Sequence, residues 1–90
     1  MQVTEVKVFP VVKEDERLKA FATITFDDCF IVRDLKVIDG TEGLFVAMPS
    51  KKRKDGQYKD IAHPLNNEMR DVIESAVLNE YNNEVSRVIL

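Results

Sequence analysis

The sequence predicts an α+β fold, an antiparallel β-meander of about four to five strands followed by one C-terminal amphipathic helix. Two observations lead to this prediction. Residues 18–26, LKAFATITF, alternate in the two-residue period of a half-buried strand. From residue 66 onward, apolar residues recur at three- and four-residue spacings, which is the period of one helix face. A chain of 90 residues is expected to form one domain, residues 1–90.

The strand region covers about residues 2–62, and turn-forming residues divide it. The strands are expected at residues 3–9, 18–26, 29–38, 44–48 and 58–62. The turns are expected at KEDER (13–17), Asp27-Asp28, DGTEG (39–43) and a polar loop, 51–57, that Asp55-Gly56 closes as a hairpin.

The helix is expected over about residues 66–81. Asn66 or Asn67 can cap its free N–H groups, and Glu68 in the first turn suits the helix dipole. Residues 82–90 form an apolar C-terminal extension that needs something to cover it. The apolar face of the helix comprises Met69, Val72, Ile73, Ala76, Val77 and Tyr81.

Apolar residues occupy both faces of the later strands. Simple alternation sets Ile31, Leu35 and Val37 on one face and Phe30 and Val32 on the other. One helix covers only one face of a sheet, so we expect a second subunit to cover the rest. A two-fold homodimer is the default arrangement.

Composition is typical of a soluble globular protein, and no run approaches the length of a membrane span. The single cysteine excludes an intrachain disulfide and favours a reducing, cytoplasmic location. The formal net charge is -3, but it divides unevenly along the chain. Residues 1–47 carry -3, residues 48–63 carry +3 and residues 66–90 carry -3. An acidic total therefore does not exclude nucleic acid, because binding responds to the local patch.

Enzymatic and metal-binding readings find little support in the residues. His63 is a candidate general base, but a lone histidine more often hydrogen-bonds a loop. Cys29 has no local feature that would activate its thiol. Asp27, Asp28 and Asp39 match no calcium or two-metal spacing and are better read as turn formers. We expect no catalytic residue, metal, cofactor or small-molecule substrate.

A basic cluster at a predicted hairpin tip is the strongest functional signal. Lys51, Lys52, Arg53, Lys54 and Lys59 gather five positive charges within one hairpin. Phosphate is a natural partner, since Lys acts as a point charge and Arg can bind two oxygens. Tyr58 can stack on a base if it is exposed. The alternative is that the cluster only solvates the hairpin tip or discourages aggregation.

The blocks VIDG, GLFVAMPSK and DIAHP stand in an order and spacing that resemble the SpoVG family, stage V sporulation protein G, from Met1 to about Tyr81. The resemblance implies a cytosolic, dimeric sheet-plus-helix protein linked to septation, sporulation and gene regulation. It also implies site-specific DNA binding, with RNA as a second target. The basic pair implicated in DNA contact in the family corresponds to Lys51 and Lys52.

The chain departs from the family pattern in the basic loop, where SKKRKDG replaces the common SKRTPDG. Arg53 and Lys54 thereby remove a rigid proline φ and add two charges, so we expect stronger attraction to phosphate. Many family members also have a longer, polar C-terminal tail. The residues and the resemblance together predict a homodimeric DNA-binding regulator, with a protein–protein adaptor in cell-division septation as the alternative.

Overall fold

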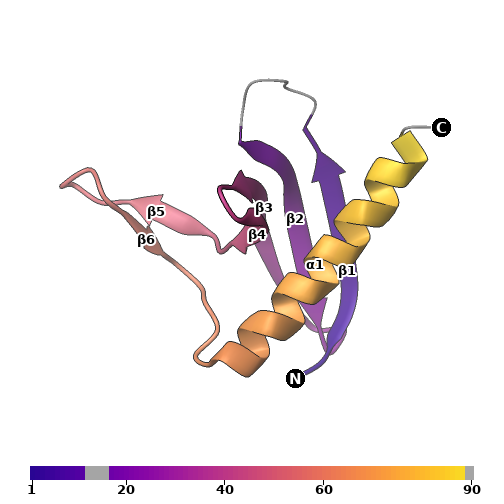
Figure 1. The fold of residues 1–90 in the computed structure, drawn as a ribbon. Helices are drawn as coiled ribbons and strands as arrows, with labels where there is room; N and C mark the ends of the chain where they lie inside the picture. The colour runs from indigo at the N-terminus through magenta and orange to yellow at the C-terminus, as the bar shows by residue number, and fades with distance from the viewer. Residues whose placement is uncertain (12–16, 89–90) are drawn as a thin grey trace.

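The structure, a computed structural model, describes residues 1–11 and 17–88 and confirms the α+β class. Four strands form one antiparallel sheet in the order β1-β2-β3-β4, and one helix follows within the described residues (Figure 1). The turn expected at residues 13–17 lies outside the description apart from Arg17. The elements are β1 (Val3–Pro10), β2 (Leu18–Phe26), β3 (Phe30–Gly40), β4 (Gly43–Ala47), β5 (Ser50–Lys52), β6 (Tyr58–Asp60) and α1 (Asn67–Val88).

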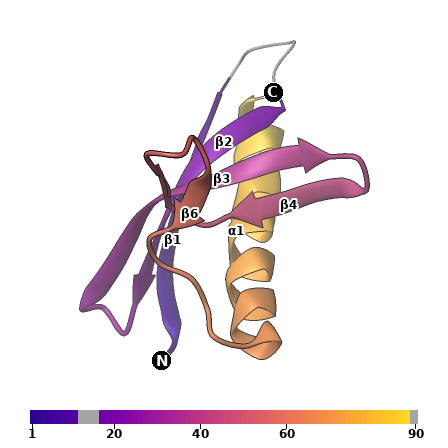
Figure 2. The same ribbon diagram turned by 90° about the vertical axis from the view of Figure 1, so that its left-hand side faces the viewer.

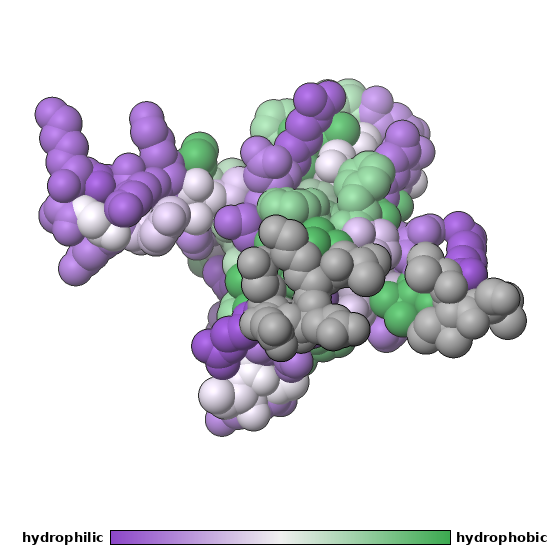
Figure 3. All heavy atoms as spheres, turned by 90° about the horizontal axis from the view of Figure 1, so that it is seen from above, coloured by the Kyte–Doolittle hydropathy of each residue, from purple (hydrophilic) through white to green (hydrophobic). Residues whose placement is uncertain are grey.

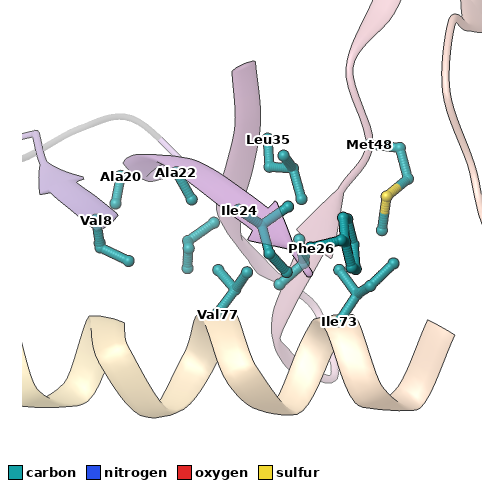
Figure 4. Close-up of a cluster of buried hydrophobic side chains, with 11 residues drawn as sticks. Val8, Ala20, Ala22, Ile24, Phe26, Leu35, Met48, Ile73 and Val77 are labelled. Carbon is teal, nitrogen blue, oxygen red and sulfur yellow. The ribbon is translucent and has the colours of Figure 1, made fainter. Parts of the chain in front are cut away.

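The helix α1 covers one face of the sheet, along β1 for most of its contact (Figures 1 and 2). The alternation in β2 is confirmed, because Ala20, Ala22, Ile24 and Phe26 are all buried against the helix. The close-up in Figure 4 shows these side chains directed toward α1, which contributes Ile73 and Val77 from its own side. Removing these apolar surfaces from water is the main force that holds the helix on the sheet.

A β-bulge in β3 changes which of its residues face the core. Ala22 pairs with Leu35 but Ile24 pairs with Val32, so the two residues between Val32 and Leu35 lie opposite one residue of β2. Asp34 takes the extra position with φ of +66°, the left-handed conformation that Asp adopts more readily than most residues. Because of this extra residue, Val32 and Leu35 both pack against the core.

The bulge corrects the faces expected from simple alternation. Leu35 and Val37 are buried, as expected for one face, but Val32 joins them and Ile31 is exposed on the opposite side. The two-residue period fails here because an unpaired residue shifts every side chain beyond it to the other face.

The outer face of the sheet, which is the face away from α1, carries exposed aromatic residues. Phe9 pairs with Phe21 across β1 and β2, and Phe45 pairs with Ile38 across β3 and β4. The rings of Phe9, Phe21 and Phe45 are all exposed. The expectation that one helix leaves apolar sheet surface uncovered is therefore met in the described chain.

The helix begins as expected and ends later than expected. Asn66 is the N-cap, because its Oδ1 accepts a 2.8 Å hydrogen bond from the N–H of Met69. The helix continues past Tyr81 to Val88, and an ion pair between Arg87 and Glu84 supports its last turns. Residues 82–88 are therefore mostly helix rather than a separate extension. The apolar side chains expected from Val88 onward lie outside the described residues.

The fifth expected strand does not join the sheet. Tyr58–Asp60 pairs only with Ser50–Lys52, and the two form a separate hairpin that projects from the body (Figure 1). Pro49 stands between β4 and β5 and has no N–H to donate, which is consistent with the interruption of pairing there. The basic cluster therefore lies on a projection from the fold.

We predict that two valines on the helix contribute very differently to stability. Both Val72 and Val77 are expected on the buried face, but Val77 is 0% exposed and Val72 is 48% exposed. Val77→Ala should lower the free energy of unfolding by about 2 kcal/mol, because it removes buried methyl groups and leaves a cavity. Val72→Ala should stay within about 0.5 kcal/mol of the unaltered protein. Chemical denaturation measures both, and equal losses would contradict the packing described.

Candidate nucleic-acid interface

The hairpin formed by residues 49–61, called the basic arm below, is held together by its own backbone. At its base the N–H of Ile61 donates to the carbonyl of Pro49 at 2.7 Å. Further out, Ser50 pairs with Asp60, and Lys52 pairs with Tyr58. Within the described residues, β5 and β6 contact no other helix or strand. The arm is therefore a two-stranded ribbon joined to the body only through its ends.

The turn at the tip follows the expected Asp55-Gly56 signal. The N–H of Gly56 donates to the carbonyl of Arg53 at 3.0 Å, and the N–H of Arg53 donates to the carbonyl of Gln57 at 2.7 Å. Gly56 has φ of +86°, which an L side chain rarely adopts. A carboxylate oxygen of Asp55 accepts from the N–H of Gln57 at 3.0 Å and closes the loop. These hydrogen bonds hold the tip of the arm, residues 53–57, in a defined turn.

All five predicted cations lie on the basic arm and are exposed. Lys51 and Lys52 belong to β5, Arg53 and Lys54 to the tip, and Lys59 to β6. Together they line one shallow hollow. In the space-filling view of Figure 3 the arm is a strongly hydrophilic projection, separate from the body. The fold thus brings the five residues together, as the hairpin pattern predicted.

The pairing within the arm places like charges against each other. Lys51 lies directly opposite Lys59 in the ladder, an arrangement that costs up to about 1 kcal/mol. Among the described residues, none of the arm's five cations forms a salt bridge. Both lysines are exposed, so water screens much of the repulsion. An anion bound between the two strands would relieve it further.

Three more residues of the arm bear on recognition. Tyr58 is 69% exposed, so its ring is free to stack on a planar group. Asp60 and Ile61 also line the hollow, and reasoning from the sequence missed them. The register of the hairpin, in which Ser50 lies opposite Asp60, brings them to the hollow.

Of the three carboxylates considered as metal ligands, Asp27 and Asp28 form a tight turn, and Asp39 lies in β3. Asp27 and Asp28 have φ of +50° and +54°, the type I′ geometry of a tight hairpin. The Oδ1 of Asp27 accepts from the N–H of Gln2 at 2.9 Å and ties this hairpin to the start of β1. In the described chain, no group of three His, Cys, Asp or Glu residues is placed to hold a metal ion.

The two candidate catalytic residues, His63 and Cys29, each take part in local hydrogen bonding of a loop or turn. The Nδ1 of His63 lies 2.9 Å from the carbonyl oxygen of Pro64. The ring therefore hydrogen-bonds the loop before α1, as expected for a lone histidine with a structural role. Cys29 is a free, exposed thiol beside the β2–β3 turn. Its backbone N–H donates to the carbonyl of Phe26 at 3.0 Å and completes that turn.

The fold and the arm together define a small α+β protein that carries a projecting basic β-ribbon. No helix of the described chain is both long and apolar enough to cross a membrane. The sequence model of the SpoVG family matches residues 1–83. Relatives with 50–66% identity extend the match over nearly the whole chain. The chain belongs to the SpoVG family.

Three relatives bear the name "Putative septation protein SpoVG". The one from Bdellovibrio bacteriovorus is 66% identical over 85 residues, which cover 94% of this chain and 77% of the relative. The one from Anaeromyxobacter sp. (strain Fw109-5) is 61% identical over 87 residues, covering 97% and 88%. The one from Caldicellulosiruptor saccharolyticus is 50% identical over 86 residues, covering 96% and 97%.

We predict that Gly56 controls the order of the basic arm but not the stability of the body. Gly56→Ala should destabilise the tip by about 1 kcal/mol, because Ala at this φ is strained although no atom lies in the way of its Cβ. Amide exchange at Arg53 should become faster, while global unfolding stays unchanged because the arm contacts no other helix or strand of the described chain. Gly56→Asn is the control, since Asn tolerates this conformation better. An equal loss of stability in the sheet would contradict the arm's independence.

Proposed function

We propose that this protein is a regulatory protein that binds nucleic acid through the basic arm, and that it acts in the control of septation or sporulation and of gene expression. The observation that carries the proposal is the ribbon itself. It holds five exposed cations, with Lys51 opposite Lys59, away from the acidic remainder of the chain. Counterion release from phosphates supplies most of the affinity of such a cluster.

Duplex DNA is the proposed target, and RNA is the second. The major groove of B-form DNA is wide enough for a two-stranded β-ribbon, which the groove of A-form RNA is not. Arg53 at the tip could bind a guanine edge in that groove, while the lysines contact phosphates. The exposed side of α1 carries Glu68 and Asp71, and its acidity disfavours contact with phosphates.

We further propose that a homodimer is the binding form. A second copy covering the outer face would bury Phe9, Phe21 and Phe45, which no element of the described chain covers. The same two-fold axis would supply a second basic arm and double the phosphate contacts. Because bacterial DNA lies in the cytoplasm, the proposal places the protein there. It assigns the chain no catalytic step.

We predict that DNA affinity falls steeply with salt and depends on the first two lysines of the arm. Four lysines in each subunit of the dimer make eight phosphate contacts, which give a slope of about -7 in a plot of log affinity against log salt. Lys51→Ala/Lys52→Ala should weaken binding at low salt and reduce the slope by about 2 for each subunit. Gel shifts over a salt series provide both quantities.

The matched control removes the same charge from the helix. Arg70→Ala/Arg87→Ala changes the net charge equally, but both arginines lie in α1 and not in the arm. This variant should keep the slope of the unaltered protein. If it weakens binding as much as Lys51→Ala/Lys52→Ala does, total charge rather than the arm governs binding.

We predict that the dimer depends on the outer face. Phe21→Lys should convert the protein to a monomer, because it places a charge among aromatic rings that the second copy would cover. Leu65→Lys is the control, since Leu65 is 92% exposed and precedes α1. Sedimentation gives the mass of each variant. A dimeric Phe21→Lys protein, or an unaltered protein that is monomeric throughout, would refute this interface.

The septation names of the relatives favour one second candidate, an adaptor that binds a division protein without nucleic acid. In that case the arm would contact an acidic protein surface. Recovery of a division protein after nuclease treatment, together with no measurable DNA affinity, would favour this candidate over the first.

A further inference from the structure

A cavity of about 160 Å³ lies where the basic arm joins the body, between the end of the sheet and the start of α1. Its floor reaches the core, because Ile24 and Leu35 line it and are each only 1% exposed. Met69 and Ile73 of α1 form one wall, and Phe30 of β3 stands at its edge, 62% exposed. The cavity is therefore half open to solvent at its rim and reaches the core at its floor.

The lining is almost wholly apolar. Among the described residues that line it, His63 is the one with a polar side chain, and its Nδ1 lies 2.9 Å from the carbonyl oxygen of Pro64. All three methionines of the chain, Met1, Met48 and Met69, line the cavity. Methionine side chains are flexible and polarizable, so they adapt to ligands of different shapes. A charged ligand would meet mostly apolar side chains here, which do not offset its loss of water.

We propose that this cavity binds a small uncharged apolar molecule, aromatic or aliphatic, with about six to nine non-hydrogen atoms. The size follows from comparison with a cavity of about 150 Å³, lined by similar residues, that binds benzene. An apolar ligand here would gain dispersion contacts with the side chains that line the cavity.

Ligand binding in this cavity is coupled to the position of the basic arm. Met48 immediately precedes the arm's first residue, Pro49, and Ala62 immediately follows its last, Ile61. Both Met48 and Ala62 line the cavity. The two chain segments that connect the arm to the body therefore form part of the cavity wall. A ligand that contacts both connecting segments binds one arrangement of them more tightly than the others. Binding therefore shifts the arm toward that arrangement. This coupling between the ligand and the arm can be measured without nucleic acid, so its test is independent of the proposed function.

The experiment uses benzene as the probe and protein labelled with ¹³C at the methionine methyl groups. Titration should produce saturable shifts of the Met48 and Met69 methyl signals, and an intermolecular nuclear Overhauser effect from benzene to Met69. Ala62→Leu fills the cavity from the arm's connection and should abolish the saturable shifts. Ala47→Leu is the matched control, because Ala47 lies in β4 and does not line the cavity, and should retain them.

Residual dipolar couplings of the amides of Lys51 to Lys54 report the orientation of the arm. They should change on saturation with benzene in the unaltered protein and in Ala47→Leu, but not in Ala62→Leu. Absence of saturable shifts and of the Overhauser effect in the unaltered protein would overturn the ligand site. Methyl shifts that instead follow protein concentration would show that a second copy occupies the cavity, and would also overturn it. Ligand binding with unchanged couplings would overturn the link to the arm.

Discussion

The structure depends on the packing of one helix against one face of a four-stranded sheet. Ile73 and Val77 of α1 meet the buried side of β2 and β3, and hydrophobic burial along this contact holds the domain together. The bulge at Asp34 is part of the same constraint, because it brings Val32 and Leu35 to the helix side. A domain this small buries only a modest core, so few residues carry most of its stability.

Because the helix and one face of the sheet form the core, the rest of the chain is available for contacts. The outer face is not needed for the core and presents aromatic rings to solvent. The basic arm contacts no other described element, so its composition is free of packing demands. Repulsion between Lys51 and Lys59 is tolerated because both side chains are solvated and the ribbon keeps its own backbone bonds. A cluster of cations can therefore be carried without loss of the fold.

Much of this arrangement could be predicted from the sequence where local chemistry decides it. The alternation of β2, the turn at Asp27 and Asp28, the cap at Asn66 and the hairpin at Asp55-Gly56 each follow from a few adjacent residues. The grouping of the five arm cations followed from that hairpin.

The remainder depends on tertiary structure. Asp34 resembles any polar strand residue, and only pairing with β2 reveals the bulge. Val72 fits the helical period, yet its side chain is 48% exposed. The cavity joins residues from both ends of the arm with residues of the core, so no short pattern marks it.

The most direct test of the central claim, that the basic arm is the nucleic-acid site, is to map amide shifts on titration with a short DNA duplex. The account predicts shifts confined to the arm, at Lys51 to Lys54, Tyr58 and Lys59. Shifts along α1 or the outer face, with the arm unchanged, would contradict it.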